Sequence, residues 1–349
     1  MPKPGSTRKG PRKTTNYRSR HAADAALPLT MRAAAIDKYG DERAIDVREM
    51  PMPRPGASEV LIRVDTAAVG SWDAGARSGE IKTEHGFPLV LGVDGSGVVA
   101  EVGSRVTRLK RGDCVYAYSF DNPRGGFYAE YCSVPAKYAA RIPEQLGLER
   151  AGALCVLGLT AIQGVDDALR IAKSETVIVH GASGNVGMIA VQLAKWRGAR
   201  VLATASGSDG VAFVRALGID EVVDGKKADD ISAAAHDFAP AGVDAVLAFA
   251  GGDSLVTCID ALRKGGRLAY PNGIEPLPRK RAHVRIKSYD AKSSPEAFNR
   301  LNRAVVASCL ETPIAAKFPL DSAADAHRLI AKGHVLGKII LRINSRSDR

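Results

Sequence analysis

Paired cysteines are missing from this sequence. The five cysteines stand singly and none belongs to a C-x-x-C pair; they are Cys114, Cys132, Cys155, Cys258 and Cys309. This spacing indicates neither a disulfide framework nor a thiolate zinc site. We therefore expect a chain that works in a reducing cytoplasm.

Long apolar runs are also missing. No apolar run reaches the roughly 18 residues that a membrane helix needs, so we expect no membrane-spanning segment and no secretory signal. The composition, 45% hydrophobic and 25% charged, excludes disorder of the whole chain. At 349 residues the chain is long enough for two domains with their own cores.

Acidic residues are nearly missing from residues 1–30, where Asp24 stands alone against seven Lys and Arg residues. This segment therefore carries +6 of the chain's net charge of +11. The segment is polar and without apolar periodicity, which predicts a disordered basic extension. It could bind nucleic acid or membrane lipid, or be a transit peptide. Alternatively, Met31 is the true initiator, because a clean strand pattern begins there.

A glycine turn between strand and helix dominates the sequence. The β-branched run 176–180 predicts a buried strand, three glycines follow at 181, 184 and 187, and residues 188–196 have helical spacing. A second strand is predicted at 201–205. Glycines let the backbone approach a pyrophosphate at a helix N-terminus. We expect Ser183, Gly184, Asn185, Val186 and Gly187 to bind a dinucleotide.

The end of the second predicted strand indicates which dinucleotide binds. NAD sites usually place a carboxylate there for the ribose 2′-OH, whereas this chain has a hydroxyl-rich sequence with Ser206 and Ser208. The pattern favours NADPH; the alternative is an ordinary polar loop. Further strands alternate with helices, which predicts a parallel doubly wound sheet. Ala250, Gly251 and Asn272 follow two of those strands, so we expect them beside the cofactor.

Residues 31–155 have short strand patterns separated by Gly and Pro, which predicts a small barrel. Two helices are expected at 149–156 and 160–168. Residues 274–294 are polar and basic and predict a long loop with some strand. This loop is either a lid, a subunit contact or simply a solvated surface.

The order of several motifs resembles the medium-chain dehydrogenase/reductase superfamily, in its zinc-independent, quinone oxidoreductase-like branch. The motifs are EVLIRVDTAAVGSWD, FPLVLGVDGSGVVAEVG, GGFYAEY, GLTA, VIVHGASGNVG and AHRLIAKGHVLGKIIL. The resemblance implies an α/β fold in which a GroES-like β-barrel catalytic domain (31–155 plus 311–349) is interrupted by a Rossmann doubly wound parallel-sheet domain (156–310).

The resemblance also bears on zinc. Zinc-dependent relatives carry Cys at the position of Gly70 and Gly-His-Glu at the positions of Gly92, Val93 and Asp94. Catalytic zinc needs three protein ligands, and the structural four-cysteine lobe has no counterpart in 118–126. We expect no metal.

The remaining site residues follow from the resemblance. Bacterial relatives have Asn at Gly70 and Tyr at Gly75 in the substrate site, so an emptier site lined by Ser71, Trp72 and Asp73 is expected. Trp72 either stacks on a flat acceptor or packs in the core, and no catalytic acid can be named.

Three further positions have a cofactor interpretation and an alternative. Thr160 lies close to the nicotinamide in relatives or caps a helix, and Lys338 approaches the cofactor or is solvated. His180 is expected to be structural. Relatives have Lys at Gly210 and Tyr at Gly225, so a 2′-phosphate would depend on the serines with Lys226 or Lys227.

The implied activity is hydride transfer from NADPH to a quinone or an α,β-unsaturated carbonyl compound (an enone or enal), without a metal. The partner is a small electrophilic acceptor, and a homodimer is expected from the family. The alternative is a dinucleotide-binding protein with little catalysis and a structural or nucleic-acid-binding role.

Overall fold

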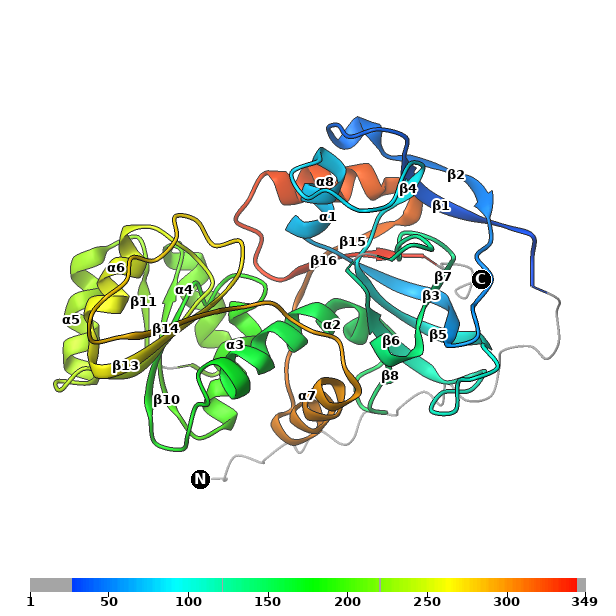
Figure 1. The fold of residues 1–349 in the computed structure, drawn as a ribbon. Coiled ribbons are helices and arrows are strands. Elements are labelled where there is room, and N and C mark those ends of the chain that lie inside the picture. Colours follow the sequence, from blue (N-terminus) through cyan, green and yellow to red (C-terminus); the bar gives the residue numbers. More distant parts are fainter. Residues whose placement is uncertain (1–26, 121, 220, 344–349) are drawn as a thin grey trace, which may run out of the picture.

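The computed structural model describes residues 27–120, 122–219 and 221–343. The predicted disordered extension, 1–30, lies outside the described residues except for its last four. Two α/β parts stand beside each other, each with its own sheet, and helix α2 runs between them (Figure 1).

One part is built on a parallel six-stranded sheet in the order β11-β10-β9-β12-β13-β14. The strands are β9 (Thr176–His180), β10 (Arg200–Ala205), β11 (Glu221–Asp224), β12 (Val243–Ala248), β13 (Leu262–Pro271) and β14 (Arg285–Tyr289). This order reverses direction between β9 and β12, which is where doubly wound sheets bind their ligands. The predicted Rossmann sheet is confirmed.

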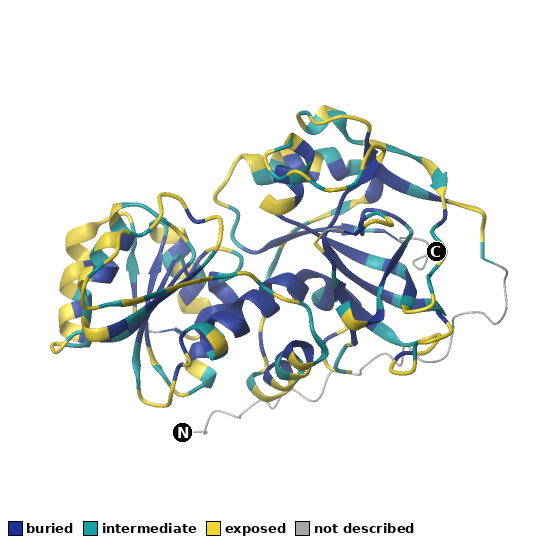
Figure 2. Ribbon diagram, in the orientation of Figure 1, coloured by how far each residue is buried: buried dark blue, intermediate teal, exposed yellow. Residues whose placement is uncertain are grey.

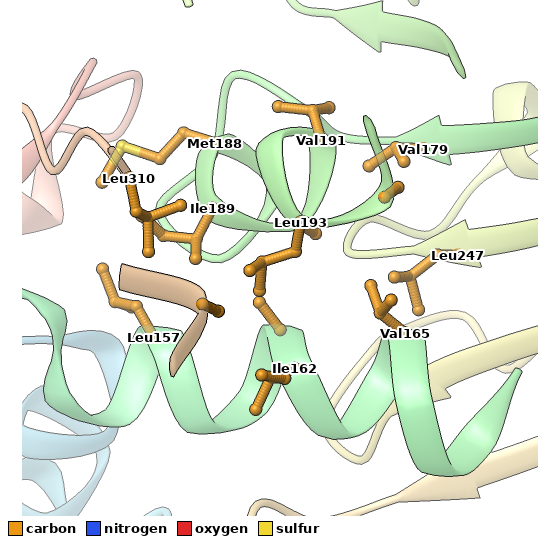
Figure 3. Close-up of a cluster of buried hydrophobic side chains, with 14 of the residues drawn as sticks. Leu157, Ile162, Val165, Val179, Met188, Ile189, Val191, Leu193, Leu247 and Leu310 are labelled. Atoms are coloured by element: carbon orange, nitrogen blue, oxygen red, sulfur yellow. The ribbon is translucent and has the colours of Figure 1, made fainter. Parts of the chain in front are cut away.

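Helices cover both faces of this sheet because successive strand residues point to opposite sides. Val177 and Val179 pack with α2 (Leu148–Gln163), α3 (Gly187–Trp196), α4 (Gly207–Ala216) and α7 (Pro295–Ser308). Figure 3 shows α2 and α3 meeting side chain to side chain in this core. Ile178 packs on the other face with α5 (Ala228–Phe238) and α6 (Asp253–Asp260).

The other part is mainly antiparallel. A seven-stranded sheet runs in the order β15-β16-β3-β5-β6-β8, with β7 paired to β3. Its strands are β3 (Glu59–Val69), β5 (Asp94–Val102), β6 (Cys114–Tyr118), β7 (Tyr131–Pro135), β8 (Ala139–Arg141), β15 (Ile314–Pro319) and β16 (Lys338–Arg342). The C-terminal strands thus return to the sheet of the N-terminal residues, as the resemblance implied.

A three-stranded sheet and two helices complete this part. The order β2-β1-β4 joins β1 (Thr30–Ile36), β2 (Asp46–Pro51) and β4 (Leu89–Val90). Helix α1 (Ser71–Ser78) directly follows β3, and α8 (Ala323–Ala331) packs on the apolar core of the larger sheet. Short 3-10 turns occur at Glu42–Ala44, Ala136–Tyr138 and Leu320–Ser322.

Helix α2 differs from its prediction. It is one helix that continues into a π-helical turn at Gly164–Ala168, so the expected break at 157–159 was wrong. Gly158 does not interrupt the helix but makes room for α7, because a Cβ there would lie 2.8 Å from the Leu301 side chain. The predicted domain boundary at 155–156 falls inside this helix.

The same helix bears on the expectation that the chain has no membrane-spanning segment. Leu148–Ala168 is long and apolar enough to cross a membrane, yet most of it is buried inside the protein. Figure 2 shows α2 as an almost continuous dark-blue helix between the two parts. It is therefore a core helix whose apolar faces are covered by both sheets.

The basic segment 274–294 is a long loop with some strand, as predicted. Its residues Arg285–Tyr289 form β14, which pairs in parallel with β13 at the edge of the six-stranded sheet. The rest is irregular, as expected. Tyr289 anchors the end of this strand, because its hydroxyl donates a hydrogen bond to the Thr160 carbonyl of α2 at 3.1 Å.

Candidate functional site

A cleft of about 430 Å³ lies between the two parts. Its lining comes from α1, α2, the glycine turn before α3 and the ends of strands β5, β6, β13 and β14. The lining residues are Gly70, Ser71, Trp72, Asp73, Val93, Asp94, Tyr118, Phe120, Val156, Leu157, Thr160, Asn185, Val186, Pro271, Asn272, Asp290, Ala291 and Lys338. A larger groove, about 900 Å³, lies beside α7 and contains none of the predicted site residues.

The glycine turn connects β9 to α3 at the edge of this cleft. Gly181 has φ +77°, a left-handed conformation that favours glycine. A Cβ at Gly187 would lie 2.2 Å from the Gly181 carbonyl oxygen, so only glycine permits this approach of helix to strand. The Asn185 amide oxygen is buried without a hydrogen-bond partner among the described residues. This turn and the α3 N-terminus together suit a pyrophosphate.

The serines after β10 lie close to the glycine turn. Ser206 donates its backbone N–H to the Ser183 Oγ at 3.1 Å, which joins the two segments. Ser208 is exposed at the start of α4. A Cβ built at Gly207 would lie 3.9 Å from the Lys226 Nζ. The ammonium group of Lys226 therefore faces the backbone between the two serines.

Two carboxylates near these serines were missed by the sequence argument. Asp224 accepts a hydrogen bond from the Gly207 N–H at 3.1 Å, and Asp209 lies in the first turn of α4. The Asp209 Oδ2 lies 2.7 Å from the His334 Nε2, and this contact lowers the pKa of the Asp209 carboxyl. Neither carboxylate lies at the end of β10. The sequence motif places the ribose-binding carboxylate at that position, so it does not point to either of them.

Thr160 and Asn272 bring α2 and β13 to the middle of the cleft. Thr160 is inside α2 rather than at a cap, and its hydroxyl donates to the Val156 carbonyl at 2.8 Å. Asn272 donates from its side chain to Asp290 at 2.8 Å, so the amide orientation is fixed. Both residues line the cleft between the glycine turn and α1.

His180 and the residues after β12 stand outside the cleft lining. The His180 Nδ1 is 2.7 Å from the Thr204 hydroxyl, and burial lowers the His180 pKa to about 4, so it is a neutral structural group. Ala250 lies against Gly181, and a Cβ at Gly251 would lie 2.2 Å from the Glu275 carbonyl oxygen. These last two positions shape the backbone behind the cleft.

The other end of the cleft is formed by α1. Trp72 is 37% exposed and meets Phe120, 44% exposed, edge to face with ring centroids 5.9 Å apart. Trp72 is therefore a wall of the cleft and not a core residue. Ser71 is exposed beside it. A Cβ at Gly75 would lie 2.8 Å from the Ile81 side chain. A side chain at this position would therefore point toward Ile81, and its absence does not enlarge the cleft.

Two buried carboxylates lie at the base of the cleft. Asp73 accepts hydrogen bonds from the Gly70 N–H at 2.8 Å and the Val93 N–H at 3.1 Å, and burial raises its pKa to about 6. Asp94 accepts one from the Val156 N–H at 2.9 Å, and burial raises its pKa to about 7. Asp73 therefore holds the loop before α1 in place.

The structure brings about half of the predicted site residues into one cleft. Ser71, Trp72, Asp73, Thr160, Asn185, Val186, Asn272 and Lys338 line it together. Asp94, Phe120 and Asp290 were missed. Asp94 was considered only as a replaced zinc-motif residue, whereas Phe120 and Asp290 stand in segments with no recognisable pattern.

Comparison with known proteins agrees with this geometry. Residues 56–144 match the alcohol dehydrogenase GroES-like domain model, and residues 185–280 match the zinc-binding dehydrogenase model. The Mus musculus quinone oxidoreductase is 29% identical over 89% of this chain and 97% of its own length. The chloroplast envelope quinone oxidoreductase homolog of Arabidopsis thaliana is 31% identical, over 89% of this chain and 98% of its own.

The chain belongs to the medium-chain dehydrogenase/reductase superfamily. Within that superfamily it falls in the quinone oxidoreductase-like branch, and it is an oxidoreductase that uses a nicotinamide dinucleotide and a small-molecule substrate. A solved NAD-dependent alcohol dehydrogenase superposes with a TM-score of 0.82, 31% identity and coverage of 90% of this chain and 100% of its own. A mycobacterial protein solved with NADPH superposes with a TM-score of 0.79 and is 26% identical, with coverage of 90% of this chain and 100% of its own.

Proposed function

We propose that this medium-chain reductase transfers hydride from NADPH to a quinone or an α,β-unsaturated carbonyl compound without a metal. The observation that carries this proposal is one cleft lined both by an aromatic pair, Trp72 and Phe120, and by Asn185 and Val186 of the glycine turn. A flat conjugated acceptor suits such a wall. When bound, the reduced nicotinamide supplies the hydride, and the protein supplies orientation and charge.

NADPH is favoured over NADH by the groups after β10. Ser206 and Ser208 offer hydroxyl donors, and Lys226 lies beside Gly207. A relative at 26% identity was solved with NADPH. Asp209 places an opposing charge in the same region, and its Oδ2 lies 2.7 Å from the His334 Nε2. An NAD-dependent relative at 31% identity makes the choice of cofactor a direct experimental question.

Metal independence is supported by the groups at the base of the cleft. Gly70 and Val93 offer no ligand side chain where zinc-dependent relatives carry Cys and His. Two carboxylates remain, Asp73 and Asp94, and the ammonium group of Lys338 lies near both. A cation in that position repels a divalent metal. The residues present therefore do not fit catalytic zinc.

The test is NADPH oxidation, followed by absorbance in the presence of EDTA, against a panel of quinones, enones, enals and simple aldehydes. Turnover with conjugated acceptors, unchanged by EDTA, supports the proposal. Loss of turnover with EDTA and recovery with zinc overturns metal independence. Turnover with simple aldehydes alone overturns the acceptor class.

The alternative role, dinucleotide binding with little catalysis, predicts NADPH binding without turnover across the same panel. If it holds, salt-dependent nucleic-acid binding that disappears when residues 1–30 are deleted would identify the role of the basic segment.

We also propose that the chain forms a homodimer and works in the cytoplasm. Light scattering of the purified chain tests the dimer, and fractionation of cells tests the location.

A further inference from the structure

Lys338 is a nearly buried lysine at the base of the cleft. It begins β16, directly after Gly337, and is only 2% exposed. Lysine is almost never fully buried unless its charge is paired. The charges of two carboxylates, Asp73 and Asp94, act on its ammonium group, but neither is within ion-pair distance. Its hydrogen-bond donors are therefore available to something in the cleft.

The surroundings of Lys338 explain how the ammonium group is held there. Asp73 and Asp94 are close enough for their charges to act on it. Both Asp73 oxygens, however, already accept backbone N–H groups from Gly70 and Val93. One Asp94 oxygen accepts the Val156 N–H. When they are ionised, the carboxylates thus provide a negative field that retains the cation without occupying its hydrogen-bond donors.

Gly70 opens the path between this ammonium group and the cleft. A Cβ at residue 70 would lie 3.4 Å from the Lys338 Nζ, in contact with it. The backbone at Gly70 has φ −135°, which any residue adopts, so glycine is not required here by the backbone. With no side chain at residue 70, Lys338 lines the cleft together with Ser71 and Asp94.

We propose that the Lys338 ammonium group binds the carbonyl oxygen of the acceptor and gives it a proton. The inference rests on the proposed reductase function. The β-carbon of the acceptor gains the hydride from the reduced nicotinamide, which is left oxidised. The electron pair of the C=C bond moves through the conjugated system to the carbonyl oxygen. The N–H bond of Lys338 breaks as the new O–H bond forms, and solvent returns the proton to the amine.

This assignment supplies the catalytic acid that the sequence did not reveal. A preorganised cation in a water-poor cleft stabilises a developing oxyanion strongly. It differs from the role that the resemblance implied for Lys338, in which the side chain holds the cofactor. The two roles are separable, because a cofactor contact changes NADPH affinity and an oxyanion contact does not.

The first experiment needs no cofactor. 4-Nitrophenol is titrated against the cofactor-free protein at pH 6, and its ionisation is read from the absorbance of the phenolate. The phenolate oxygen imitates the oxyanion of the reaction. We expect wild type to bind it as phenolate at least tenfold more tightly than K338M, and K338R to retain most of the affinity. Equal phenolate affinity in K338M and wild type overturns the inference.

Two variants make this comparison specific. K317M removes a lysine from the neighbouring strand β15, whose Nζ bonds Glu149 outside the cleft, and should bind the phenolate like wild type. G70V leaves Lys338 in place but puts a branched side chain against its Nζ, and should lose phenolate binding. Melting temperatures of all variants confirm that they are folded. If G70V and K338M fold and both bind the phenolate normally, the inference is wrong.

The second experiment separates this inference from the proposed function. In K338M we expect kcat for enone reduction to fall at least 100-fold while the NADPH Kd, read by fluorescence, changes less than threefold. A weaker NADPH Kd with unchanged kcat overturns the acid role and supports the cofactor role. If wild type reduces no acceptor but binds the phenolate through Lys338, the reductase proposal fails and the oxyanion site stands.

Discussion

His334 of the loop before β16 pairs with Asp209 in the first turn of α4, with 2.7 Å between the His334 Nε2 and the Asp209 Oδ2. The pair joins the two parts of the molecule beside the serines that follow β10. Since both side chains are about half exposed, its effect on stability is small. A charged ligand bound between the two parts would lie close to the Asp209 carboxylate, so we expect this residue to matter more for binding than for stability.

Replacing Asp209 should change the preference between the two dinucleotides. D209N removes a negative charge near the proposed 2′-phosphate position, so we expect NADPH to bind about threefold more tightly and NADH to be unchanged. H334Q leaves the carboxylate unpaired and should weaken NADPH. Equilibrium fluorescence titrations with both cofactors measure this, and parallel changes for NADPH and NADH would contradict it.

Lys226 should matter for NADPH alone. Its Nζ faces the backbone at Gly207, whereas the neighbouring Lys227 pairs with Asp230 at 3.6 Å. An exposed charge contact is worth about 1 kcal/mol, so K226M should weaken NADPH about fivefold and leave NADH unaffected. K227M is the matched control and should change neither. Similar losses in both variants would point to general surface charge instead.

The glycine turn gives a prediction about stability. G187A places a Cβ 2.2 Å from the Gly181 carbonyl oxygen, so α3 must move away from β9. We expect a loss of roughly 1–3 kcal/mol in the free energy of unfolding together with weak dinucleotide binding. In G184A the Cβ lies 3.2 Å from the same oxygen, a much smaller conflict. Denaturant unfolding of the two variants compares them, and equal losses would refute this account.

Asp94 should make stability depend on pH. Burial raises its pKa from 3.8 to about 7, so the folded state holds a proton that the unfolded state releases between these values. The stability that this bound proton gives to the folded state is fully present below about pH 4 and is lost as the pH rises to about 7. Relative to wild type, D94N should therefore gain roughly 4 kcal/mol between pH 4 and 8. A constant difference across that range would show that Asp94 is ionised throughout.

Trp72 should act on acceptor binding. Its ring forms one wall of the cleft with Phe120, so W72A should raise KM for quinones about tenfold, while W72F should change it less than threefold. The NADPH Kd should stay the same in both. An unchanged KM in W72A would place the acceptor elsewhere in the cleft.

Local patterns predicted the parts of the fold whose residues carry their own signal. The β-branched run of β9, the glycines after it and the helix α3 follow rules of spacing, and all three occur where the sequence placed them. The parallel order of the sheet followed from the alternation of strands and helices. Gly158 misled the prediction, because the sequence cannot show that α7 needs that space.

The site was predicted less completely for a related reason. Asn185 and Thr160 belong to motifs, whereas Phe120 and Asp290 reach the cleft only through tertiary packing. The role of Lys338 is the clearest case. A lysine after a glycine is usually solvated, and only the structure shows that the missing side chain of Gly70 places its ammonium group at the base of the cleft.

The unbroken helix α2 has a consequence for the modularity of this protein. Its buried residues complete the core of the parallel sheet and also cover strands β3, β5 and β6 of the other part. Dividing the chain within Leu148–Ala168 would remove α2 from the core of the parallel sheet and uncover these strands. We therefore expect the two parts to unfold in one cooperative transition, which calorimetry would check.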